Sequence, residues 1–211
     1  MRTEILKIHA ATPETSLIKY AAEQIQAGQV LGMPTDTFYG LAADPFNLRA
    51  VERVYEIKSR LRHKPLSLLI ENVDQAEEFA RPLPDDFHLL ARRFWPGPLT
   101  MIVPAASHLP LKVTANTGRI ALRWPKSPIV EGLIEEFGGP ITGTSANISG
   151  FPSCANAAQV MKQLGSRLPL VLDAGETGAM LASTIVELNG DSWKIGREGA
   201  IPVADIERAL K

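Results

Sequence analysis

Positive charge is concentrated where a predicted helix gives way to a predicted strand. Four of the 22 Lys and Arg residues fall within residues 58–64, which read Lys-Ser-Arg-Leu-Arg-His-Lys. A clump at such a junction places several cations on one short arc of backbone, whereas cations spread along a helix usually solvate its surface. Phosphate is the anion that this arc would bind. A solvated surface run is the alternative that this segment alone leaves open.

A hydroxyl-rich loop, residues 34–41, follows the apolar strand predicted at residues 30–33. Open α/β sheets gather ligands at the carboxyl ends of their strands. Thr35 and Thr37 can donate and accept hydrogen bonds, and Gly40 permits close approach of the backbone. The loop could also be a turn whose side chains satisfy only local backbone groups.

A second loop, residues 144–150, follows another apolar strand and carries Ser145 and Asn147. Small polar side chains of this kind can surround phosphate or ribose oxygens. The loop lacks the Gly-Lys-Ser/Thr ending and the Gly-x-Gly-x-x-Gly pattern of common nucleotide-binding loops. Its alternative is a plain helix-entry loop, since Asn156 can cap the helix that follows.

Two arginines end predicted strands. Arg123 ends the strand at residues 119–123, and Arg197 ends the strand at residues 193–197. The planar guanidinium can bond two oxygens of a carboxylate or phosphate and keeps its charge at any relevant pH. Each could equally be a surface ion-pair partner. Ser183, which opens a further apolar strand, is a weaker candidate.

Other kinds of catalytic site are not visible in the sequence. No Ser-His-Asp arrangement or paired-carboxylate motif is present, and Cys154 lies in a loop without an evident basic partner, which favours an incidental thiol. The four histidines show no metal-ligand spacing. Residues 95–100 are typical of a rigid helix-to-strand corner. We therefore expect neither a covalent mechanism nor a metal bound by the protein.

Composition limits the class of protein. The chain has 211 residues, 45% of them apolar, which fits one large domain spanning residues 1–211. The 22 basic residues nearly balance the 23 acidic ones, so any anion site must be local. One cysteine excludes an internal disulfide and fits a reducing cytosol. No apolar run is long enough for export or for a membrane span.

Alternating helix and strand patterns predict an α/β fold, built on a twisted, open, mixed sheet flanked by helices. One helix is expected to begin at Pro13 with Thr12 as its cap and to end before Gly28, and others to begin after Asn47 and Ser127. Asn189 and Gly190 predict a hairpin turn. Strands are expected at residues 30–33, 66–70, 99–103, 119–123, 141–144, 168–172, 183–188 and 193–197.

Taken together in order, six motifs resemble the YrdC-like family of threonylcarbamoyl-AMP synthases, and the resemblance covers nearly the whole chain. The motifs are residues 34–41, Lys58-Ser59-Arg60, residues 95–100, residues 144–150, Ser183-Thr184-Ile185-Val186 and Arg197-Glu198-Gly199. The resemblance implies a cytoplasmic enzyme with a basic concave cavity. Its reaction joins L-threonine, bicarbonate and ATP into L-threonylcarbamoyl-adenylate and releases diphosphate. The product supplies the threonylcarbamoyl group of a modified adenosine in tRNA.

The resemblance also implies a role for each matched residue. Threonine is expected at Thr37, Arg123, Ser183 and the backbone of Gly143, and ATP at Arg60, Lys64, Ser145, Ser153 and Arg197. Lys58 and Asn147 would complete the surroundings of the triphosphate and of the Mg²⁺ that accompanies ATP. Lys58 and Arg60 are the candidate catalytic residues, because fixed cations would offset the repulsion between a carbamate and the triphosphate.

Three positions depart from the family pattern. Leu61 stands where many members have Pro, Lys64 where many have Asn, and Leu69 where some have a His that touches threonine. The last change leaves the choice of amino acid open. We also expect the C-terminal domain and the linker that closes over ATP in longer relatives to be absent.

Three alternative functions remain at this stage. One is the activity of a sister, YciO-like branch with another substrate, and a second is a passive module that binds tRNA or double-stranded RNA. The near-neutral charge and the lack of an aromatic stacking platform argue against the second. The third, the carbamoyl-adenylate chemistry of hydrogenase maturation, comes with zinc-finger and acylphosphatase segments that this chain lacks. For the synthase, tRNA contact and transfer of the adenylate to the tRNA-modifying transferase complex are expected.

Overall fold

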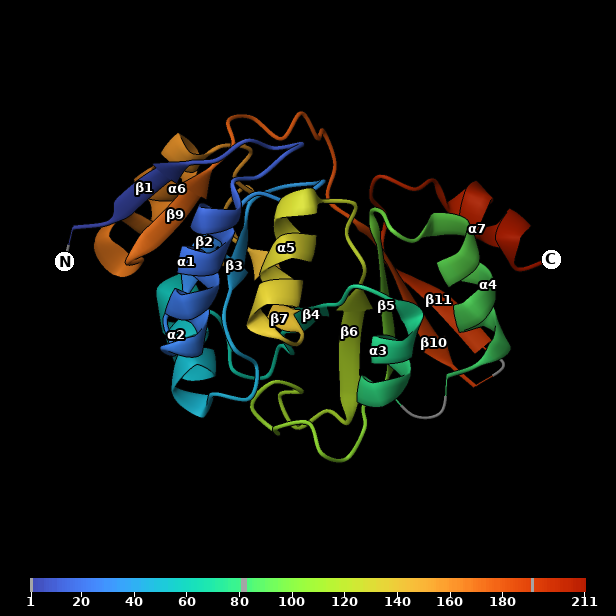
Figure 1. Ribbon diagram of the computed structural model, residues 1–211. Coiled ribbons are helices and arrows are strands. Elements are labelled where there is room, and N and C mark those ends of the chain that lie inside the picture. Colours follow the sequence, from blue (N-terminus) through green and yellow to red (C-terminus); the bar gives the residue numbers. More distant parts are fainter. Residues whose placement is uncertain (1, 81–82, 191) are drawn as a thin grey trace.

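Two mixed β-sheets form the frame of the molecule (Figure 1). The computed structural model describes residues 2–80, 83–190 and 192–211. The five-stranded sheet has the order β1 (Glu4–Lys7), β9 (Leu170–Asp173), β2 (Leu31–Met33), β3 (Gly40–Ala42), β8 (Thr144–Ser145). The six-stranded sheet has the order β11 (Ser192–Arg197), β10 (Thr184–Asn189), β5 (Leu99–Pro104), β6 (Arg119–Arg123), β4 (Ser67–Leu69), β7 (Ile141–Thr142). The predicted α/β class is confirmed, although the strands divide between two sheets.

Helices lie beside each sheet (Figure 1). With the five-stranded sheet lie α1 (Thr15–Gln26), α2 (Leu48–Lys58) and α6 (Ala157–Leu164), which runs into a 3₁₀ turn at Gly165–Arg167. With the six-stranded sheet lie α3 (Val73–Phe79), α4 (Asp85–Phe94) and α7 (Val203–Ala209), while α5 (Pro128–Phe137) lies between the two groups. No helix in the described part of the chain is long and apolar enough to span a membrane.

The segment predicted as one strand at residues 141–144 is divided between the sheets. β7 pairs with β4 in the six-stranded sheet, and β8 pairs with β3 in the five-stranded sheet. Gly143 lies between them, and a Cβ atom at this position would overlap the side chain of Leu69. Glycine therefore lets the chain pass from one sheet to the other beside β4.

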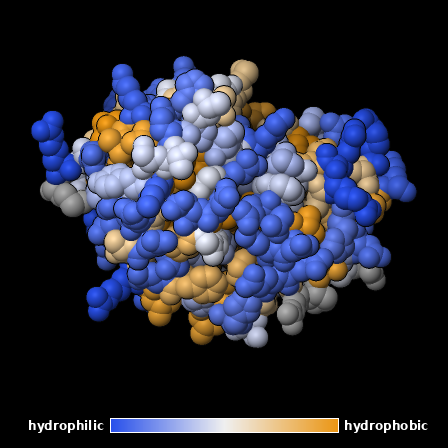
Figure 2. Space-filling view, viewed as in Figure 1, coloured by the Kyte–Doolittle hydropathy of each residue, from blue (hydrophilic) through white to orange (hydrophobic). Residues whose placement is uncertain are grey.

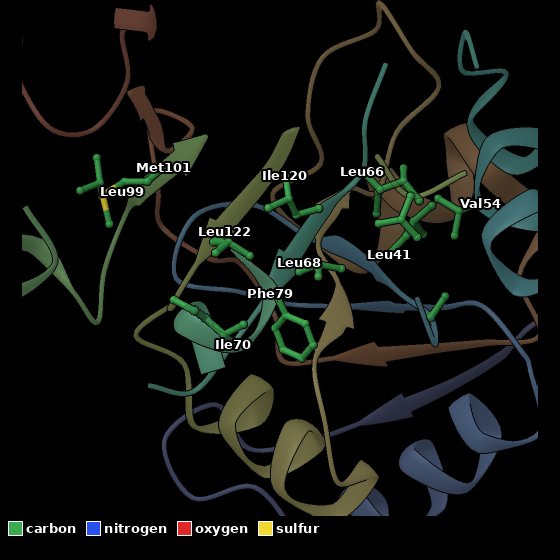
Figure 3. Packing of buried hydrophobic residues seen from close by; sticks show 14 of the residues in the cluster. Leu41, Val54, Leu66, Leu68, Ile70, Phe79, Leu99, Met101, Ile120 and Leu122 are labelled. Carbon is green, nitrogen blue, oxygen red and sulfur yellow. The ribbon is translucent and has the colours of Figure 1, made fainter. Parts of the chain in front are cut away.

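Among the described residues, the buried apolar side chains form two clusters. The larger cluster fills the space between the sheets and helices α2, α3, α4 and α6, and Figure 3 shows part of it, with residues from β3, α2, β4, α3, β5 and β6. The smaller cluster packs α1 and α5 against β2 and β9. Hydrophilic side chains cover most of the face seen in Figure 2. The packing also includes apolar residues of the polar loops, since Tyr39 and Ala146 belong to the larger cluster.

Helix α2 ends at the cluster of positive charge. Asn47 caps its start by accepting hydrogen bonds from the backbone N–H groups of Arg49 and Ala50, as the sequence predicts. Its end is Ser59, whose φ of 50° puts it in the left-handed region. The backbone N–H of Arg60 then donates to the carbonyl of Tyr55, so the chain turns sharply at the start of the charged segment.

Other predicted boundaries are mostly confirmed. Ser127 and Asn156 cap α5 and α6, Gly138 ends α5, and β10 and β11 form the predicted hairpin. The predicted start of the first helix at Pro13 is wrong, because α1 begins at Thr15 and its N-cap is Glu14. The backbone N–H of Thr12 instead donates to Nδ1 of His9, so this residue belongs to the preceding turn.

We expect Asn47→Ala to lower the free energy of unfolding by about 1 kcal/mol, because two backbone N–H groups at the start of α2 lose their acceptor. Urea denaturation measures this change, and the m-value should stay constant. Asn47→Asp keeps an acceptor and is the control. Equal stability of the alanine variant would show that the cap contributes nothing to α2.

Candidate active site

A cavity of about 690 Å³ is lined by residues from both sheets. Its wall includes the loop after β2, the charged segment after α2, the carboxyl end of β6 and the start of β10. Nine of the eleven residues that the sequence singles out line it: Thr37, Arg60, Lys64, Arg123, Gly143, Ser145, Ser153, Ser183 and Arg197. Residues far apart in the sequence thus share one hollow.

Strand alternation explains the floor of the cavity. Thr100 and Ile102 on β5 face it, as do Arg119, Ala121 and Arg123 on β6. Residues two apart on a strand point to the same face of a sheet, so each strand contributes alternate side chains. The opposite faces of the same strands carry core residues, including Met101 and Leu122.

Arg123 is held at one end of the cavity by three acceptors. Its Nε donates to the carbonyl of Gly97 at 3.2 Å, Nη1 to Oγ1 of Thr37 at 2.9 Å, and Nη2 to Oδ1 of Asp36 at 2.7 Å. Thr35 uses its hydroxyl locally, donating to the carbonyl of Phe38. The sequence allows two interpretations of this loop, as part of a ligand site or as a turn held by its own side chains, and both are correct in part. Thr35 stabilises the turn, and Thr37 faces the site.

Arg197 approaches the same end from β11. Its Nη2 donates to the carbonyl of Ser183 at 2.7 Å and to Oγ of Ser183 at 3.1 Å. Oγ of Ser183 also lies 2.8 Å from Oγ1 of Thr100. Ser183, Thr100 and Arg197 form a linked polar group beside Arg123.

The charged segment after α2 forms another part of the wall. Arg60 donates from Nη2 to the carbonyl of Pro65 at 2.8 Å and from Nε to the carbonyl of Lys64 at 3.3 Å. These bonds brace the turn that carries Arg60, Lys64 and His63, all of which line the cavity. Arg62 points elsewhere and pairs with Glu52.

Two of the predicted residues lie behind the wall and do not line the cavity. Lys58 is 1% exposed, and its Nζ donates to the carbonyl of Asn147 at 2.9 Å and to the carbonyl of Ser145. Asn147 is also buried, and its Nδ2 donates to the carbonyls of Ile148 and Phe151. Lys58 thus ties the end of α2 to the loop that presents Ser145.

Backbone carbonyls are the main partners of the cations. Lys58, Arg60, Arg123 and Arg197 each donate to at least one peptide oxygen, and in the described residues only Arg123 among them also pairs with a carboxylate. The one carboxylate among the described lining residues is Glu187, which pairs with Lys194. A peptide oxygen satisfies a donor without cancelling its charge, so the cavity keeps a positive balance suited to an anion.

Burial shifts the titration of these groups. Burial and the charge of Arg60 lower the pKa of Lys58 to about 7. Burial lowers the pKa of Arg123, although the carboxylate of Asp36 opposes the shift, and burial and the charge of Arg123 lower the pKa of Arg197. Burial raises the pKa of the Cys154 thiol, which fits an unreactive cysteine.

Sequence reasoning overlooked three charged residues at this site. Asp36 lay in a recognised motif but was given no role, and Arg119 and Glu187 line the cavity. Arg119 stands four residues before Arg123 on one strand, and Glu187 four after Ser183 along another. Even spacing along a strand places residues on one face, and this signal could have found both.

Comparison with known proteins identifies the family. A family model named for Sua5, YciO and YrdC, with the description "Telomere recombination", matches residues 23–199. The chain belongs to this family. The structure is similar to that of P. abyssi Sua5 complexed with L-threonine, with a TM-score of 0.94 at 35% identity over 98% of this chain and 61% of that one. E. coli YciO shares the fold, with a TM-score of 0.87 at 24% identity over 95% of this chain and 98% of that one.

Sequence relatives are similar over most of the chain. The threonylcarbamoyl-AMP synthases of Pyrococcus abyssi and Bacillus subtilis are 36% and 37% identical to it over 92% of its length. The chain spans 57% and 56% of those two proteins, and 87% of a relative from Mycobacterium tuberculosis that is 37% identical over 90% of this chain. Membership of the family therefore rests on the core that all of them share.

Lys58 makes the stability depend on pH. Its pKa is about 7 in the folded protein and 10.5 by reference, so between these values the unfolded chain binds more protons. Burying the charged amine destabilises the folded protein. This penalty is absent above pH 10.5, grows as the pH falls, and is complete below about pH 7.

We expect the wild type to gain stability relative to Lys58→Met as the pH rises from 7 toward 9, by up to about 1.4 kcal/mol per pH unit. Urea denaturation at several pH values measures the difference. The exposed Lys162, changed to Met, is the control and should show no such slope. A pH-independent difference for Lys58→Met would show that the amine keeps its proton throughout this range.

Proposed function

We propose that this chain is a threonylcarbamoyl-AMP synthase, which makes L-threonylcarbamoyl-adenylate and diphosphate from L-threonine, bicarbonate and ATP. The observation that supports this most is the convergence of Arg60, Lys64, Arg123 and Arg197 on one cavity with a single lining carboxylate in the described residues. The relatives from Pyrococcus abyssi and Bacillus subtilis are both named threonylcarbamoyl-AMP synthase, which also supports the proposal.

In the proposed arrangement, Arg123 binds the carboxylate of threonine. Its guanidinium is anchored by Gly97, Asp36 and Thr37, and it still lines the cavity. Thr37, Ser183 and the backbone of Gly143 complete this end. Leu69 adds an apolar wall next to Arg123, with which it is paired in register between β4 and β6. A small amino acid would fit such a mixed polar and apolar pocket.

The triphosphate of ATP would lie toward Arg60, Lys64 and Arg197, with Ser145 and Ser153 as hydroxyl partners. Lys58 and Asn147 would act from behind by holding the loop that carries Ser145. The described residues include no group of three His, Cys, Asp or Glu side chains that could ligate a metal. Mg²⁺ therefore enters in this proposal as part of the MgATP substrate, held by phosphate oxygens.

The chemistry needs positioning and charge more than a protein nucleophile. The amine of threonine captures bicarbonate as a carbamate with loss of water. A carbamate oxygen then attacks the α-phosphorus of ATP, the bond to the β-phosphate breaks, and diphosphate leaves. Both reactants are anions, so fixed cations lower their repulsion and stabilise the leaving group. Holding them in line supplies a further part of the rate.

The proposed product is a mixed anhydride, which water hydrolyses, so a nearby acceptor should consume it. We place that acceptor in the threonylcarbamoyl transferase machinery that modifies adenosine in tRNA, in the cytoplasm. tRNA itself could contact the basic segment at the cavity mouth, where Arg62, His63 and Lys64 are exposed.

Purified protein with ATP, Mg²⁺, labelled bicarbonate and one amino acid at a time should form diphosphate and a labelled adenylate, fastest with L-threonine. Product separation and diphosphate release measure this outcome. A faster reaction with another amine would favour the sister-branch activity, which the apolar Leu69 makes the main competitor. Salt-sensitive RNA binding without ATP turnover would favour the RNA-binding module.

Arg60→Ala should lower kcat/KM for ATP by about 100-fold, because a fixed cation at the triphosphate is lost. The two hydrogen bonds from Arg60 are near the surface, so the free energy of unfolding should fall by only about 1 kcal/mol. Arg62→Ala is the matched control, since Arg62 is two residues away but pairs with Glu52 outside the cavity. Equal activity of Arg60→Ala and Arg62→Ala would remove Arg60 from the ATP site.

A further inference from the structure

The ion pair between Asp36 and Arg123 differs from the others in the described residues. Its two side chains are 13% and 9% exposed, whereas every other pair has a partner that is at least 50% exposed. Exposed ion pairs contribute little to the stability of the folded protein, because water and salt screen their charges. A buried pair is held in one geometry by the surrounding protein.

Hydrogen-bond counting shows what the pair leaves free. A guanidinium has five N–H donors. Arg123 uses one on Nε for Gly97, one on Nη1 for Thr37 and one on Nη2 for Asp36. One N–H therefore remains on each of the two terminal nitrogens. Since Arg123 lines the cavity, these are the donors that a bound carboxylate can use.

Asp36 also joins the two sheets at this point. It belongs to the loop between β2 and β3 of the five-stranded sheet, while Arg123 ends β6 of the six-stranded sheet. Its negative charge offsets a cation that lies close enough to Arg197 for the two charges to influence each other. Without Asp36, the side chain of Arg123 would lose both a partner and its only counter-charge in the described residues.

We propose that Asp36 is a positioning residue for the amino-acid substrate: by fixing the guanidinium of Arg123 at the cavity wall, it sets the affinity for the substrate carboxylate without touching the substrate. This inference rests on the proposed function. The side chain of Asp36 itself is not among the residues that line the main cavity. It therefore acts through Arg123.

The test compares Asp36→Asn with Asp36→Ala. The amide keeps an oxygen that can accept from Nη2 but has no charge, and alanine removes both. We expect Asp36→Ala to raise KM for L-threonine roughly 10- to 100-fold, with a smaller rise for Asp36→Asn. KM for ATP should stay within about twofold of the wild type in both variants, because Asp36 is proposed to act only on the threonine carboxylate. General damage to the site would instead raise both KM values. Calorimetric titration with L-threonine alone should show the same order of affinities.

Asp44→Asn is the matched control, because the Asp44 carboxylate accepts a hydrogen bond from the backbone N–H of Phe46 and lies in the loop after β3. It should leave both KM values unchanged. If Asp36→Ala does not fold, as judged by circular dichroism, Asp36→Asn carries the test. Wild-type affinity for threonine in both variants, or an equal rise of both KM values, would overturn the role of Asp36. Failure of the wild type to make any adenylate would instead overturn the proposed function.

Discussion

The site depends on how buried and half-buried cations are satisfied without being neutralised. Arg60, Arg123 and Arg197 line the cavity and donate to peptide carbonyls, and Arg123 alone among them has a carboxylate partner in the described residues. Carbonyl dipoles meet the hydrogen-bonding demand of a cation but leave its charge in place. An arrangement of this kind costs desolvation energy, and burial accordingly lowers the pKa of Arg60, Arg123 and Arg197. It leaves a positive hollow ready for an anion.

The two sheets hold this arrangement because their connections meet at the cavity. The chain crosses from one sheet to the other at Gly143, where the side chain of Leu69 fills the space that a Cβ would need. The loop after β2 reaches back across to Arg123. The larger apolar cluster includes residues of both sheets, and the smaller one packs α1 and α5 against β2 and β9, so the polar groups lie on a rigid support.

Local patterns predicted the elements that local forces control. Asn47, Ser127 and Asn156 each cap a helix as expected, because a cap needs only a side chain within a few residues. Thr12 failed as a cap because its backbone bonds to His9 in the preceding turn, a competing contact of the same range. The split at Gly143 was not predictable, since it follows from Leu69, which is remote in sequence. Spacing on a strand could have pointed to Arg119 and Glu187 but not to their partners.

The sequence by itself determined the α/β class, the family and a set of candidate site residues, because motif order and strand periodicity are written in the chain. Only the tertiary structure decided which of those residues face the hollow. Lys58 and Arg60 are two positions apart in one motif, yet one is buried behind the Ser145 loop and the other forms the wall. Asp36 acquires its partner from a strand that lies more than eighty residues away. Long-range contacts of this kind depend on how two sheets pack, which no local pattern specifies.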